Sequence, residues 1–232
     1  SNGTMMVIER FFDSNIDSMP SANLLNALNY KLLHASDFSL VKYSIVHFAD
    51  FFRGMVQLTK LLGDEKAPLL IRSFIERARS LMKNRVVQEL IERNPLKQLS
   101  MVDTVYFGRY LKEHFRNSTL ELIAIFGRLD AWYSLAFATR HYNMSFPEFS
   151  LQPQPLIDAK ELYHLLLPKP GPTDVHMCRD SNFIFLTGAN MAGKSTLIKS
   201  VGSAVFLAHI GMGVPAASMR LTLFDGLISN IN

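Results

Sequence analysis

The chain has 232 residues, of which 48% are hydrophobic and 19% are charged, and its formal net charge is +4. This length suffices for one large domain or two smaller ones. The single cysteine, Cys178, excludes an intrachain disulfide framework and a multi-cysteine metal site, which favours a reducing, cytoplasmic location. No apolar run reaches the roughly 18 to 20 residues of a membrane span, so we expect no membrane partner.

Residues 1–144 are predicted to form an all-helical domain. Between residues 23 and 143 glycine and proline are scarce, and apolar residues recur at helical spacing. Two apolar stripes are expected to face the core between packed helices. The first stripe comprises Leu24, Leu25, Leu28, Leu32 and Leu33, and the second comprises Val41, Ile45, Phe48, Phe51, Phe52, Met55 and Leu58.

Further helices follow in this half of the chain. Gly63 interrupts the periodicity, and later helical patterns cover residues 67–92, 105–116 and 118–141. The first of these is expected to end before Pro95, because a residue that precedes proline is disfavoured in the helical region. Ser118 is predicted to cap the last helix, with Glu121 completing a capping box.

Residues 145–232 are predicted to be a second domain. Six prolines lie between residues 145 and 172 and indicate loops rather than continuous helix. The apolar run 182–187 is typical of a strand buried on both faces of a parallel sheet. A helical pattern from 194 to about 210 follows, so this half is predicted to be part of an α/β domain.

The predicted strand and helix are joined by a loop that matches the Walker A spacing of glycine, four residues, glycine, lysine and serine. The glycines let backbone N–H groups point at phosphate oxygens. Lys194 is expected to neutralise the β- and γ-phosphates as the catalytic residue, and Ser195 to place its hydroxyl on Mg²⁺. The predicted ATP-binding residues are Gly188, Ala189, Asn190, Met191, Ala192, Gly193, Lys194, Ser195 and Thr196.

The residues around this loop resemble the MutS family of DNA mismatch-repair ATPases. Residues 187–196 read TGANMAGKST, which is similar to the loop of that family, and Met191 distinguishes it from transporter-type ABC ATPases, which carry glycine there. Residues 207–216, LAHIGMGVPA, resemble the family's Leu-Ala-Gln-Ile-Gly-x-x-Val-Pro-Ala block, and Phe224-Asp225 resembles the Phe-Asp that follows. The resemblance is strong over residues 120–228 and only architectural before them.

The resemblance implies a helical core and lever domain followed by the first part of an ABC-like P-loop NTPase domain. It implies a DNA-repair ATPase that binds ATP and Mg²⁺ in a homodimer through the ATPase domain and couples nucleotide state to clamp movement on mismatched or branched DNA. The family's Walker B and signature residues would lie beyond residue 232. We therefore expect this chain alone to hydrolyse ATP poorly or not at all, since no carboxylate that orients the attacking water follows the loop.

Two other classes of function remain open. One is a P-loop ATPase of the ABC or SMC kind, which acts in transport or chromosome handling and not in mismatch repair. The other is a non-catalytic interaction module whose helices dimerise. By analogy with the family, His164 either lines the nucleotide pocket or is a structural loop residue, and His209 is expected to be a surface or packing residue.

Overall fold

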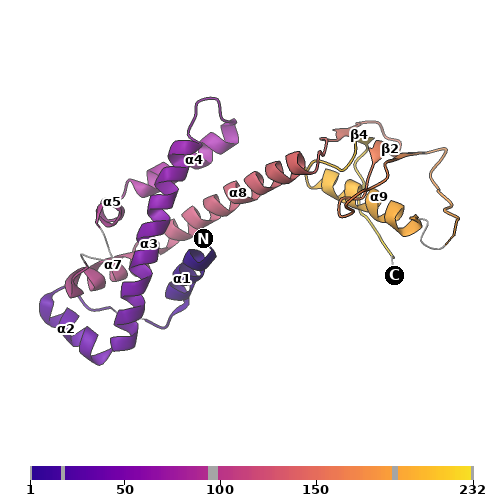
Figure 1. The fold of residues 1–232 in the computed structure, drawn as a ribbon. Helices are drawn as coiled ribbons and strands as arrows, with labels where there is room; N and C mark the ends of the chain where they lie inside the picture. The colour runs from indigo at the N-terminus through magenta and orange to yellow at the C-terminus, as the bar shows by residue number, and fades with distance from the viewer. Residues whose placement is uncertain (1, 17–18, 94–98, 190–192, 231–232) are drawn as a thin grey trace. The chain divides into compact units, whose positions relative to one another are not determined.

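The computed structural model describes residues 2–16, 19–93, 99–189 and 193–230 (Figure 1). The chain divides into two compact units, residues 1–130 (unit 1) and 131–232 (unit 2). Their boundary lies inside one helix, α8 (Arg116–His141), whereas the division into domains at residues 144 and 145 stays a prediction. No helix within the described ranges is both long and apolar enough to cross a membrane.

Every regular element described in unit 1 is a helix, which confirms the predicted helical character of this part. Besides the first part of α8, the helices are α1 (Asn2–Asp13), α2 (Leu24–Leu33), α3 (Ala35–Leu61), α4 (Leu69–Met82), α5 (Arg85–Glu92) and α7 (Met101–Glu113). The longest, α3, contacts α1, α2, α4, α5 and α7. It therefore organises the core of this unit.

The core around α3 is rich in aromatic rings. The Phe48 ring meets the rings of Phe11 and Phe12 edge-on, with centroids 5.3 and 5.5 Å away, and Phe52 meets Phe115 at 5.9 Å. Edge-to-face pairs contribute about 0.5 to 1.5 kcal/mol beyond their buried area. The second predicted stripe is confirmed, since all of its members are buried except Leu58, which is half-buried.

The first predicted stripe is wrong. The exposed fractions of Leu24, Leu25, Leu28, Leu32 and Leu33 on α2 lie between 41% and 78%. The helix instead buries Ala27 and Tyr30, which lie on its other side. Burial, followed by the charge of Asp37, raises the pKa of Tyr30. Periodicity shows that apolar residues share one side of a helix, but the neighbours α3 and α7 decide which side is covered.

Two predicted helix boundaries also need correction. The pattern over 67–92 is divided into α4 and α5, because the Asn84 side chain accepts hydrogen bonds from the N–H groups of Val86 and Val87 and so caps a new helix. The pattern over 105–116 is one helix over 101–113, which begins at a cap on Ser100.

The predicted cap at Ser118 is wrong. This residue lies inside α8, which begins at Arg116, and the Glu121 carboxylate instead pairs with the Arg77 guanidinium at 2.6 Å. The capping box of unit 1 is formed by Ser100 and Asp103, whose side chains each accept from the other's backbone N–H at 3.1 Å. Both pairs have the serine-x-x-acid spacing, and only the local backbone chooses between them.

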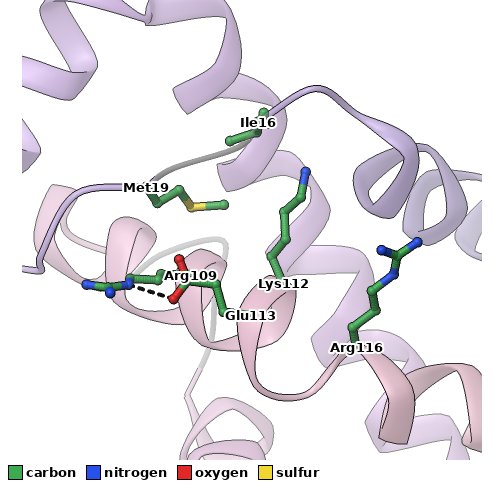
Figure 2. Close-up of a pocket in the computed structure, with 6 residues that line it drawn as sticks. All are labelled: Ile16, Met19, Arg109, Lys112, Glu113 and Arg116. Carbon is green, nitrogen blue, oxygen red and sulfur yellow. Dashed lines mark hydrogen bonds and ion pairs between the residues drawn. The ribbon is translucent and has the colours of Figure 1, made fainter.

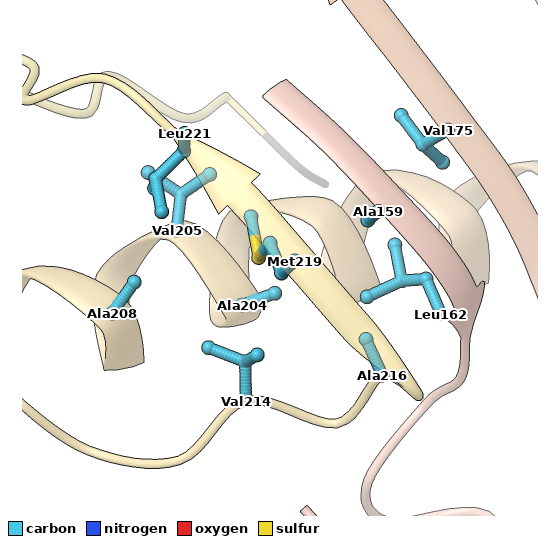
Figure 3. Packing of buried hydrophobic residues seen from close by; sticks show 10 residues of the cluster. All are labelled: Ala159, Leu162, Val175, Ala204, Val205, Ala208, Val214, Ala216, Met219 and Leu221. Carbon is cyan, nitrogen blue, oxygen red and sulfur yellow. The ribbon is translucent and has the colours of Figure 1, made fainter. Parts of the chain in front are cut away.

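Unit 2 contains a small mixed sheet covered by one helix. The elements are β1 (Glu148–Phe149), β2 (Leu156–Leu162), β3 (Thr173–Cys178), α9 (Lys194–His209) and β4 (Ser218–Leu221). The strand order is β1-β4-β2-β3, with β1 and β4 parallel and the other pairs antiparallel. Buried side chains of α9 meet those of β2 and β4 in one cluster (Figure 3). The predicted helix from residue 194 is confirmed.

The predicted strand over residues 182–187, all of which the structure describes, is wrong. None of these residues joins the sheet, and the exposed fractions of Phe183 and Phe185 are 76% and 79%. A strand forms only where a neighbouring strand supplies partners for its N–H and C=O groups. The apolar run predicts a segment suited to burial, but the described sheet does not pair with it.

We predict that Ser100→Ala lowers the free energy of unfolding by about 1 kcal/mol, because the N-terminal turn of α7 loses an acceptor. Ser118→Ala is the matched control, and we expect it to cause no loss because Ser118 is inside a helix. Denaturant titration followed by circular dichroism measures both. Equal losses for the two variants would contradict the assignment of the cap.

Candidate functional site

The loop before α9 has backbone geometry that glycine favours. Gly193 directly precedes the helix with φ 82° and ψ 10°, in the left-handed region, and Gly188 has φ 147°. Residues with a Cβ rarely adopt either conformation. No heavy atom lies within 4 Å of a Cβ built on Gly193, so backbone strain alone disfavours a side chain there. Asn190, Met191 and Ala192 lie outside the described residues.

The Lys194 side chain turns back onto this loop. Its ammonium donates hydrogen bonds to the carbonyl oxygens of Gly188 and Ala189, each 2.7 Å away. Within the described ranges it forms no ion pair with a carboxylate. An ammonium has three N–H donors. The loop therefore holds a positive charge that no neighbouring acidic side chain neutralises.

The first turn of α9 adds backbone donors to this charge. The first intrahelical hydrogen bond runs from the Leu197 N–H to the Gly193 carbonyl at 2.9 Å. The N–H groups of residues 194–196 precede it, and such groups, together with the helix dipole, favour an anion. Ser195 is exposed and Thr196 is half-buried in this turn. The structure thus brings Gly193, Lys194, Ser195 and Thr196 together at the start of one helix.

The position of this helix is fixed by its buried face. Ala204, Val205 and Ala208 have exposed fractions of 6% or less and share a cluster with Met219 and Leu221 of β4 (Figure 3). Burying a side chain of the size of Val205 contributes about 1.5 to 3 kcal/mol. The start of α9 is therefore held in place by packing further along the helix.

His164 stabilises a turn through hydrogen bonds to its ring and its carbonyl group. Its ring Nδ1 accepts a hydrogen bond from the Leu166 N–H at 3.3 Å, and its carbonyl accepts one from the Leu167 N–H at 3.2 Å. The interpretation that it lines a nucleotide pocket stays a prediction.

Asp174, Glu161 and His209 have structural roles that the sequence did not indicate. The Asp174 carboxylate accepts from the Glu161 N–H at 2.9 Å and pairs with the Lys160 ammonium at 3.0 Å, which together lower the pKa of Asp174. Glu161 has a left-handed φ of 52° beside an irregularity in the pairing of β2 and β3. His209 is hydrogen-bonded through both ring nitrogens. The partners lie 13 or more residues away in most of these contacts, so local patterns carry no signal of them.

A cavity of about 170 Å³ in unit 1 is lined by three basic residues together with Ile16, Met19 and Glu113 (Figure 2). Each of its cationic groups is used by the fold. Arg109 pairs with Glu113 at 2.9 Å, the Lys112 ammonium donates to the Ser14 carbonyl at 2.7 Å, and the Arg116 guanidinium lies 5.6 Å from the centre of the Phe12 ring. These contacts stabilise the packing of the helices. They give no separate reason to place a ligand in the cavity.

A second cavity, of about 120 Å³, lies in unit 2 and is mostly apolar. It is lined by Pro155, Leu156, Ile157, Met177, Cys178, Asn182 and Phe224. Nowhere in the described ranges do three or more histidine, cysteine, aspartate or glutamate side chains cluster in a way that could hold a metal ion. The loop before α9 is therefore the best-supported candidate site.

Comparison with known proteins agrees with this choice. Residues 184–232 match MutS domain V, a range that contains the loop and all of α9. This part of the chain is therefore similar to the MutS family. Curated relatives include the DNA mismatch repair protein MutS of Pelotomaculum thermopropionicum, which is 39% identical over 109 residues, or 44% of this chain and 12% of the relative. The predicted resemblance to the MutS family is thereby confirmed.

Eukaryotic proteins of the same family match a similar part of the chain. The probable DNA mismatch repair protein Msh6 of Drosophila melanogaster is 35% identical over 133 residues, or 53% of this chain and 11% of that protein. MutS protein homolog 5 of Caenorhabditis elegans is 33% identical over 122 residues, or 50% of this chain and 9% of that protein. The chain thus spans about a tenth of the length of these MutS-family relatives.

We predict that Gly193→Ala lowers the free energy of unfolding by about 1 to 2 kcal/mol, because alanine is disfavoured at φ 82°. Gly202→Ala is the matched control inside α9, where a new Cβ has no heavy atom within 4 Å. There the same change stabilises by about 0.5 to 1 kcal/mol. Chemical denaturation compares the two, and stabilisation by both variants would show that the left-handed glycine is not required.

Proposed function

We propose that the chain binds ATP with Mg²⁺ through residues 188–196. One observation carries the proposal: Gly193, in a left-handed conformation, is followed directly by Lys194 as the first residue of a helix whose other end is buried against a sheet. Glycine at the turn, a lysine charge and free helical N–H groups are the features that hold a polyphosphate. The residues of this loop therefore fit the triphosphate of a nucleotide.

Each residue of the loop has a distinct role in this proposal. The Lys194 ammonium exchanges its two bonds to the Gly188 and Ala189 carbonyls for bonds to the β- and γ-phosphates. Ser195 directs its hydroxyl at the magnesium ion, and the Thr196 hydroxyl faces a phosphate. A magnesium ion held by Ser195 would neutralise part of the phosphate charge.

We further propose that this chain acts in a MutS-type DNA-repair ATPase. Nucleotide state would be coupled to movement on mismatched or branched DNA, in a homodimer that forms through the ATPase domain. The support is the match to MutS domain V and the relatives named for DNA mismatch repair. These matches favour this function over an ABC or SMC ATPase that acts in transport or chromosome handling.

Isothermal titration calorimetry with Mg-ATP tests the nucleotide site. We expect Lys194→Ala to weaken binding by at least about tenfold, because hydrogen bonds to a charged group contribute about 1.5 to 3 kcal/mol. Lys199→Ala removes the same charge from an exposed position on the same helix and serves as the control. We expect its affinity to stay within about twofold of the wild type, since a screened surface charge contributes less than about 1 kcal/mol. Equal affinities for the wild type and Lys194→Ala would contradict the proposal.

The magnesium ligand is tested separately by Ser195→Ala. We expect this variant to keep its affinity for ATP in the absence of Mg²⁺ and to lose most of the increase that Mg²⁺ gives the wild type, because only the metal ligand is removed. Ser203→Ala, an exposed serine further along α9, is the control. Titrations with Mg²⁺ and with a chelator measure the difference, and an unchanged response to Mg²⁺ in Ser195→Ala would remove Ser195 from the site.

A further inference from the structure

His209, the last residue of α9, is hydrogen-bonded at both nitrogens of its ring. Nδ1 lies 2.8 Å from the carbonyl oxygen of Val205, one turn back in the helix, and Nε2 lies 2.9 Å from the backbone nitrogen of Phe224. The rings of Phe149 and Phe224 lie 5.7 and 5.8 Å from the imidazole, centre to centre. The imidazole is therefore held by contacts from three segments of unit 2.

These two hydrogen bonds determine the protonation state of the ring. The Val205 carbonyl can only accept, so Nδ1 must carry the proton that it donates. The Phe224 N–H can only donate, so Nε2 must be the unprotonated nitrogen that accepts it. Only the neutral imidazole with its proton on Nδ1 satisfies both partners.

This arrangement links two ends of unit 2. Helix α9 runs 16 residues from Lys194 to His209, which is about 24 Å. Phe224 lies shortly after β4, whose end is joined to β2 by the hydrogen bond between the Thr222 N–H and the Leu156 carbonyl at 3.0 Å. His209 thus ties the end of α9, the helix that begins at the candidate loop, to the chain segment that leaves the sheet.

Protonation of His209 at Nε2 removes the acceptor for the Phe224 N–H, and no neighbouring carboxylate in the part of the chain that the structure describes pairs with the charged ring. The charged groups on the segments around it are Glu148 on β1, Arg220 on β4 and Asp225 next to Phe224. Among the ion pairs of the described residues, none joins either carboxylate to the His209 ring. The helix C-terminus favours a positive charge, but protonation also places an N–H directly opposite the Phe224 N–H. That contact cannot survive as a hydrogen bond.

We propose that His209 is a positioning residue that fastens the segment beginning at Phe224 to the end of α9, and that it does so only as a neutral imidazole. Protonation of the ring removes the hydrogen bond to the Phe224 N–H and loosens the backbone there, while the hydrophobic cluster between α9 and the sheet, against which the Phe224 side chain packs, stays intact. The test compares the two ends of the interval from about pH 5 to pH 8, in which histidine side chains in general change charge. The proposal concerns unit 2 alone and does not depend on nucleotide binding.

NMR on the whole chain tests the proposal through two readouts. The imidazole ¹⁵N shifts of the wild type at the alkaline end of that interval are expected to show a protonated Nδ1 and an unprotonated Nε2. Hydrogen exchange then gives the protection factor of the Phe224 amide, corrected for the intrinsic exchange rate. We expect this factor to fall about tenfold in the wild type as pH decreases through the interval, which corresponds to loss of one hydrogen bond.

Two variants separate this link from a general role in packing. His209→Gln supplies an NH₂ donor group and a carbonyl acceptor on a planar amide without a titratable proton. We expect it to retain protection of the Phe224 amide at both ends of the pH interval. His209→Ala is expected to lose protection at every pH. A neutral ring with its proton on Nε2, or a fall in protection in His209→Gln equal to that of the wild type, would overturn the proposal.

Discussion

The structure depends on the burial of one side of α9 against the small sheet of unit 2. Ala204, Val205 and Ala208 of the helix share a cluster with Met219 and Leu221 of β4. Because this packing is apolar and tight, the helix has one orientation on the sheet. This packing also fixes the position of Lys194, the first residue of the helix, beside the carbonyl groups of Gly188 and Ala189. A hydrophobic contact several turns away thus sets the geometry of a polar site.

Two side-chain hydrogen bonds position segments of unit 2 in addition to this apolar packing. Asp174 holds the irregular backbone at Glu161, and His209 holds the segment at Phe224. Neither contact belongs to the regular ladder of the sheet, and both join parts of unit 2 that are distant in sequence. The first stabilises the irregular part of the pairing between β2 and β3, and the second stabilises the segment that follows β4.

Unit 1 shows the limit of helical periodicity. The aromatic stripe of α3 is buried as predicted because α3 is surrounded by other helices, whereas the leucines of α2 are exposed. Both stripes follow helical periodicity in the sequence. A sequence pattern shows which residues share one side of a helix, and packing against the other helices determines which side is buried. Residues 182–187 show the same limit for strands, since an apolar run supplies no pairing partner.

By itself the sequence determined the helical character of unit 1, the helix from Lys194 and the loop composition, since these follow from short-range rules of periodicity and backbone freedom. The similarity to MutS domain V could also be recognised from the sequence, because the matching residues are contiguous in the chain. Only the tertiary structure decided the mixed strand order, the exposed side of α2, the division between α4 and α5, and the hydrogen-bond partners of His209. Most of these depend on contacts between residues far apart in the chain, whose positions no local pattern encodes. The break before α5 is local. There the Asn84 side chain can either cap a new helix or lie within a continuous one, and the folded backbone adopts the cap.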